Sequence, residues 1–180
     1  DHRGQRRADH VVIDDAFIRA DAGLRQLHAR FADAVWRQDA AAFAQCFARD
    51  GEWKIAQLHF RGREDIEGKV GALLGYCERI TLITGQPLFE LTDEGATGRV
   101  AMTELAKVKD GSSAMTLGIY YDRYVEEDGR WRFRWRHWGL HYRGPIDLSA
   151  EFVPCPDYGP PPGVPGPDEP TYTRRAPVID

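Results

Sequence analysis

The chain has 180 residues, of which 42% are hydrophobic and 29% charged, and its formal net charge is −4. This length accommodates one domain with a single substantial core, and the charge balance gives no basic field for nucleic acid. No apolar run approaches the roughly 18 residues of a membrane span, so the composition predicts a soluble globular protein that binds neither nucleic acid nor membrane.

Three helices are predicted in the first half of the chain. Residues 1–14 are charged and are expected to form an N-terminal arm. Asp21 is placed to cap a first helix that runs to about Gln38, because apolar residues recur there at three- and four-residue spacing. Asp39 is expected to cap a second, shorter helix. A short strand over 53–60 precedes a third helix. The residues that mark the second and third helices are Phe43, Cys46 and Phe47, then Ile66, Val70, Leu73, Leu74 and Cys77.

From residue 80 onward the pattern changes to strands. Residues 80–92, 97–109, 113–126 and 130–142 each look extended, and Gly-containing pairs separate the later ones. The pair at 128–129 is Asp-Gly between two alternating runs, which is among the strongest hairpin signals. In register, Gly118, Tyr120 and Asp122 share one face of this hairpin. The order predicts an α+β domain in which helices cover one face of a curved antiparallel sheet.

The end of the chain has a different composition. From Pro154 onward it holds nine of the chain's eleven prolines, which excludes a helix or a central strand. The domain is therefore expected to span 15–148, followed by a proline-rich extended tail over 149–180. This tail is either a strap over a surface or a disordered segment.

The three cysteines show no metal-binding pattern. Cys46, Cys77 and Cys155 are widely spaced, and none belongs to a Cys-x-x-Cys or Cys/His cluster. A reduced, cytoplasmic protein with no bound metal is the default expectation.

Three stretches resemble, in their order and spacing, the SnoaL-like and scytalone dehydratase-like branch of the nuclear transport factor 2-like superfamily. They are 31–51, with its Phe31-Ala-Asp-Ala-Val and Asp50-Gly51 pieces, 60–66, and the hairpin over 118–134. The resemblance covers roughly residues 20 to 145. It implies a cone, in which a curved sheet wraps the long first helix and leaves a deep apolar pocket at its mouth. It also implies a homodimer or homotrimer.

Many members of this branch are cofactor-free lyases, isomerases, hydrolases or cyclases that act on hydrophobic oxygenated rings, and others do no chemistry. Two known catalytic sets do not match this chain. The His and Asp positions of dehydratase-like members hold Leu82 and Trp36, and the Tyr and Asp positions of ketosteroid isomerase-like members hold Phe31 and Ile55. The fold alone therefore does not determine the function.

Other polar residues are candidates for catalysis. The resemblance turns Tyr120 toward the cavity, where its hydroxyl can donate a proton or hydrogen bond, unless it is only a core tyrosine. Glu104 lies in an otherwise apolar strand and is a candidate base, or it pairs with Arg134 or Arg136. Asp122 is expected to support Tyr120 or an arginine, with a catalytic role of its own as the alternative.

Histidines and aromatic residues complete the predicted site. His59 and His137 are the pocket-lining histidine candidates, whereas His28 reads as the edge of the first helix's apolar stripe. An aromatic lining favours a flat, apolar, aromatic ligand. The predicted substrate-binding residues are Phe31, Trp36, Trp53, Ile55, Leu82, Met102, Asp122, Arg136 and Trp138.

Three functions remain open on this reading. The first is a cofactor-independent lyase or isomerase that acts on a hydroxylated aromatic or polycyclic molecule, through loss of water or retro-aldol loss of formaldehyde. The second is a non-catalytic protein that binds a small aromatic ligand. The third, ranked last, is an assembly subunit like those of ring-hydroxylating oxygenases.

Overall fold

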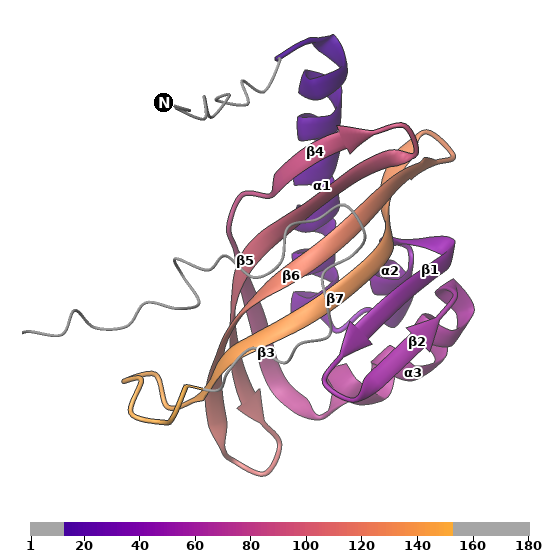
Figure 1. Cartoon of the computed structure of the whole chain (residues 1–180). Helices are drawn as coiled ribbons and strands as arrows, with labels where there is room; N and C mark the ends of the chain where they lie inside the picture. The colour runs from indigo at the N-terminus through magenta and orange to yellow at the C-terminus, as the bar shows by residue number, and fades with distance from the viewer. Residues whose placement is uncertain (1–12, 153–180) are drawn as a thin grey trace, which may run out of the picture.

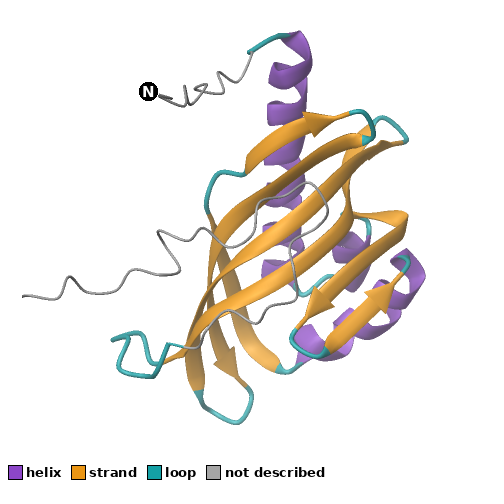
Figure 2. Cartoon of the chain, in the orientation of Figure 1, coloured by secondary structure: helices purple, strands orange, loops and turns teal. Residues whose placement is uncertain are grey.

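Three helices cover one face of a strongly curved sheet in the computed structural model, which describes residues 13–152 (Figures 1 and 2). The helices are α1 (Asp15–Arg37), α2 (Ala40–Ala44) and α3 (Arg63–Gly75). The strands are β1 (Phe47–Ile55), β2 (Leu58–Arg61), β3 (Cys77–Thr84), β4 (Leu88–Thr92), β5 (Gly95–Val108), β6 (Ser113–Glu127) and β7 (Arg130–Gly144). The architecture is the predicted α+β cone.

Helix α1 begins earlier than predicted. Its N-cap is Asp14, whose side chain accepts a hydrogen bond from the Phe17 amide at 2.8 Å. Asp21 instead lies inside the helix and pairs with Arg25 one turn later. At the other end, Gln38 adopts a left-handed conformation, and its side-chain amide donates to the carbonyls of Leu74 and Cys77. The C-terminal end of α1 is thereby tied to the end of α3.

The segment after α1 contains a shorter helix and one more strand than predicted. Asp39 caps α2 as expected, because its side chain accepts from the Ala42 amide at 2.9 Å. The helix ends at Ala44, so Phe47 already belongs to β1. The predicted single strand over 53–60 is wrong. Ala56 has a positive φ of 50°, and the chain reverses there to form the β1–β2 hairpin.

The sheet is mixed rather than purely antiparallel. Its order is β2-β1-β7-β6-β5-β3, with β4 also paired to β5. The prediction fails at one junction, where β1 runs parallel to β7. The predicted strand over 80–92 is in fact β3 and β4, which are separated around Pro87 and both pair with β5. In the third helix, Leu73 is 38% exposed and Cys77 opens β3 instead of ending the helix face.

The β6–β7 hairpin is confirmed. Its turn residues, Asp128 and Gly129, have φ values of 55° and 69°, as a two-residue turn of the favoured handedness requires. We call the sheet face that packs against α1 the inner face, and its opposite the outer face. Tyr120 and Tyr124 of β6 point to the inner face, where they join the core with Phe31 and Phe133.

Residues 1–12 and 153–180 lie outside the described residues. The predicted N-terminal arm, the predicted proline-rich tail and Cys155 therefore fall almost entirely outside them. No helix within 13–152 is long and apolar enough to cross a membrane.

Candidate active site on the inner face of the sheet

The inner face carries rows of side chains that are paired across β5, β6 and β7. One row joins Val100, Tyr120 and Trp138, and the next joins Gly98, Asp122 and Arg136. Two further rows lie on the other side of the Tyr120 row. The nearer one contains Met102, Gly118 and Leu140, and the farther one contains Leu82, Glu104, Thr116 and Arg143. Burial falls along this series. Asp122 and Arg136 are fully buried, whereas Leu82, Glu104 and Leu140 are only half-buried.

Arg136 and Asp122 form an ion pair inside the core. Both side chains are 0% exposed, and Arg136 Nε lies 3.4 Å from Asp122 Oδ1. The guanidinium packs against three aromatic rings, with its central carbon 3.8 Å from the Tyr120 centroid, 3.9 Å from Phe133 and 4.3 Å from Phe31. Within the described residues, none of its nitrogens makes a hydrogen bond. A buried arginine is costly unless it is paired, so the rings and one carboxylate carry its stabilisation.

A hydrogen-bonded chain leads from Asp122 to α1. The Tyr124 hydroxyl donates to Asp122 Oδ2 at 3.0 Å, and His28 Nε2 lies 3.0 Å from the same hydroxyl. Because the hydroxyl proton points to the carboxylate, Nε2 carries the proton that His28 donates to the tyrosine oxygen. Burial, and secondly the positive charge of Arg136, holds the pKa of His28 well below 6.5, so this histidine is neutral.

Burial also dominates the titration of the two inner-face groups in the centre of the site. It raises the pKa of Asp122 to about 6, against the opposing effects of Arg136 and the Tyr124 hydrogen bond. It raises the pKa of Tyr120 well above its ordinary value, so this phenol keeps its proton at neutral pH. Tyr120 is 5% exposed, and its ring lies 4.7 Å from that of Trp138.

Glu104 is the carboxylate of the half-buried end. Burial raises its pKa, while Arg143 and Thr116, which lie in the same row, lower it. The expected pairing with Arg134 or Arg136 is wrong. Arg134 instead pairs with Asp50 at 2.7 Å, and Arg136 with Asp122. Glu104 is therefore a partly desolvated carboxylate beside the apolar Leu82 and Met102.

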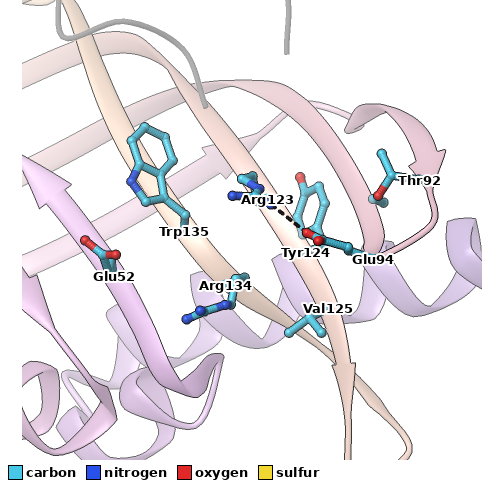
Figure 3. A pocket seen from close by; sticks show the side chains of 9 residues that line it. Glu52, Thr92, Glu94, Arg123, Tyr124, Val125, Arg134 and Trp135 are labelled. Carbon is cyan, nitrogen blue, oxygen red and sulfur yellow. Dashed lines mark hydrogen bonds and ion pairs between the residues drawn. The ribbon is translucent and has the colours of Figure 1, made fainter. Parts of the chain in front are cut away.

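A separate pocket of about 480 Å³ lies on the outer face (Figure 3). Arg123 and Glu94, which form an ion pair at 3.0 Å, lie along one side, and Trp135 lies on the other. Its remaining lining residues are Glu52, Thr92, Ala96, Tyr124, Val125 and Arg134. Its charged side chains already have partners within the protein. Among the described residues, no group of three His, Cys, Asp or Glu side chains could hold a metal ion.

The sequence over residues 17–137 matches the family model of the SnoaL-like domain. The chain belongs to the SnoaL-like family. No curated protein matches the sequence significantly.

Solved structures share the SnoaL-like fold of this chain. The Mycobacterium tuberculosis protein Rv3472, solved as a variant and of unknown function, is 27% identical with a TM-score of 0.64, over 77% of this chain and 80% of that one. A candidate scytalone dehydratase from Novosphingobium aromaticivorans is 14% identical with a TM-score of 0.68, over 78% and 95%. A type 2 hexachlorocyclohexane dehydrochlorinase, LinA, is 18% identical with a TM-score of 0.66, over 81% and 96%. The last two likenesses concern the fold alone.

Three predicted site residues of this SnoaL-like chain lie away from the inner face. His59 pairs in register with Lys54 on the outer side of β1 and hydrogen-bonds Glu52 at 2.5 Å. His137 is opposite Tyr121, on the outer face, because its neighbours Arg136 and Trp138 both point inward. Trp36 is 58% exposed, outside the buried stripe of α1. These three side chains are therefore not among the residues gathered on the inner face, and their predicted roles in a site stay predictions.

The other predicted residues gather on the inner face. Phe31, Trp53, Met102 and Trp138 are buried core residues, and Ile55 and Leu82 pack against them while half-buried. Sequence reasoning missed His28 and Tyr124 as partners of Asp122. The available signal was a histidine within the apolar stripe of α1, one turn before Phe31.

Proposed function

We propose that this SnoaL-like protein is a cofactor-independent lyase or isomerase that removes a proton from a small hydroxylated aromatic or polycyclic molecule. The observation that supports this proposal most directly is the environment of the Glu104 carboxylate. Glu104 is a half-buried carboxylate on the inner face, and burial raises its pKa toward the range of a useful general base. Leu82 and Met102 beside it are apolar.

Glu104 and Tyr120 divide the chemistry between them. The carboxylate accepts a proton from the substrate, and the electron pair left behind expels water, releases formaldehyde in a retro-aldol step or returns to another carbon in an isomerisation. Tyr120 keeps its phenol proton and donates a hydrogen bond to the oxygen on which negative charge develops. The Arg136 guanidinium, whose central carbon lies 3.8 Å from the Tyr120 ring centroid, partly offsets the effect of burial on the pKa of this phenol.

The spacing of these groups favours a fused-ring substrate. Glu104 pairs with Thr116, and Tyr120 lies four residues further along β6, which corresponds to about 13 Å at ~3.3 Å per residue. Met102, in the single row between them, supplies apolar surface, and Trp138, in the same row as Tyr120, supplies flat surface. A planar molecule of two or more rings can therefore contact both ends.

The test is a mass-spectrometric screen of the purified protein, without added cofactor, against hydroxylated aromatic and polycyclic compounds. We expect a product lighter by water or formaldehyde, or an isomer of unchanged mass. Glu104→Gln should lower turnover by about 100-fold or more, and Tyr120→Phe by at least about tenfold. The matched control is Glu90→Gln, because Glu90 is an exposed carboxylate on β4. Full activity in Glu104→Gln would exclude this mechanism.

A non-catalytic ligand-binding protein is the second candidate. It is favoured by Leu82 and Trp36, which stand where dehydratase-like members have a catalytic His and Asp. In that case the same screen returns a retained ligand of unchanged structure with every variant. The homodimer or homotrimer and the cytoplasmic location stay predictions, and light scattering of the purified chain measures the first.

A further inference from the structure

The central charges of the inner face are already balanced before any ligand binds. Arg136 has Asp122 as its counter-ion at 3.4 Å, and both side chains are 0% exposed. His28 is neutral, and Glu104 adds a carboxylate at the half-buried end. The arginine that would attract an anionic ligand is therefore neutralised at its own position, while a further carboxylate, Glu104, lies at the half-buried end of the inner face.

We propose that Asp122 is a specificity-determining residue, which makes the inner face select an uncharged aromatic ligand over the matching anion. The inference rests on the proposed function in one respect, namely that the inner face is the ligand site. An anion loses its hydration on entering, and opposite charge or hydrogen-bond donors must replace that loss. With Asp122 ionised, the field of Arg136 is largely cancelled at the ligand.

The surrounding residues hold this ion pair in place. The Tyr124 hydroxyl donates a hydrogen bond to Asp122 Oδ2, and His28 Nε2 hydrogen-bonds the same hydroxyl. The other carboxylate oxygen, Oδ1, therefore faces Arg136. The guanidinium is enclosed by the rings of Phe31, Tyr120 and Phe133. Arg136 therefore has no free path away from Asp122 toward a ligand.

Protonation of Asp122 should weaken the preference of the inner face for an uncharged ligand over an anion. The groups that face the pair are His28 from α1, Tyr120 and Tyr124 from β6, and Trp53 from β1, and none of them is charged near neutral pH. The Cys46 thiol also senses Arg136 and stays protonated, because burial raises its pKa to about 12. Gly98 of β5 has no side chain at this row. The pair thus changes its net charge through Asp122 alone, whose pKa burial raises to about 6.

The experiment compares 2-naphthamide with 2-naphthoate, which have nearly the same shape but differ in charge, by titration calorimetry at pH 7.5. We expect the wild-type protein to bind the amide at least tenfold more tightly. In Asp122→Asn, the naphthoate affinity should rise at least tenfold, and the naphthamide affinity should stay within threefold. A wild-type protein that prefers naphthoate, or an Asp122→Asn variant that keeps the wild-type preference, overturns the inference.

A second measurement needs no variant. Naphthoate is ionised throughout pH 5.5 to 8, so its wild-type affinity should rise as the pH falls through the titration of Asp122. Glu104→Gln is the control for the other titrating carboxylate and should keep this pH dependence, whereas Asp122→Asn should abolish it. A flat profile in the wild type contradicts the inference.

The two proposals fail separately. If Glu104→Gln keeps full turnover while the amide preference holds, catalysis by Glu104 is excluded and the selection by Asp122 stands. If turnover depends on Glu104 while Asp122→Asn does not change the preference, only the present inference is overturned. Binding of neither ligand to the wild-type protein overturns the aromatic ligand class on which both depend.

Discussion

The ionisation of Asp122 should have a measurable effect on folding. Burial raises its pKa from an ordinary value of 3.8 to about 6. The folded state therefore holds a proton on this carboxyl between these two pH values, whereas the unfolded state has already released it. The difference between the two pKa values corresponds to about 3 kcal/mol. This contribution to the free energy of unfolding is fully present below pH 3.8 and is lost as the pH rises through about 6.

Asp122→Asn removes this titration while it keeps an acceptor for the Tyr124 hydroxyl. We expect the free energy of unfolding of the wild type, measured relative to that of the variant, to fall by about 2.4 kcal/mol between pH 4 and pH 7. Urea denaturation of both proteins at each pH measures this quantity, and the titration of all other carboxyls cancels in the difference. A difference that does not change with pH would refute the buried, destabilised carboxylate on which the reasoning depends.

Two further predictions concern packing and backbone conformation. Phe31→Ala should cost about 3–5 kcal/mol in urea denaturation, because Phe31 is 1% exposed and contacts Phe43, Tyr120 and Phe133; Ile18→Ala, at a residue that is 55% exposed, is the control and should cost far less. Gly129→Ala should lower the thermal midpoint, since the left-handed φ of 69° costs an alanine about 1–2 kcal/mol. Gly68→Ala in α3 should raise it, because nothing lies within 4 Å of the added carbon and alanine favours a helix by about 1 kcal/mol. Equal shifts in the two glycine variants would contradict this account.

Local patterns in the sequence predict those features that local physics determines. The Asp-Gly turn and the alternating runs beside it predict the β6–β7 hairpin and place Tyr120 and Asp122 on one face. Asp39 predicts the start of α2, since its side chain meets an amide three residues later. The half-buried position of Glu104 on the inner face is predicted in the same way, because Glu104 is a lone carboxylate within an apolar strand, while its role as a base stays a prediction.

The remaining features depend on contacts between distant parts of the chain. The register of β7 shifts at a bulge opposite Arg123 and Tyr124, so alternation alone does not tell that Arg136 points inward and His137 outward. His28 meets Tyr124 only after α1 docks on the sheet. The residue spacing within α1 therefore cannot predict that Tyr124 is the partner of His28.

The parallel pairing of β1 with β7 has a consequence for synthesis of the chain. Phe47 and Trp53 find their strand partners in Phe133 and Arg136, at the far end of the described sequence. While the ribosome is still making β3 to β6, the β1–β2 hairpin has an open edge with no strand beside it. The sheet can close only when β7 has emerged, so a nascent chain that stalls before Arg136 should carry an unprotected strand edge that invites pairing with other chains.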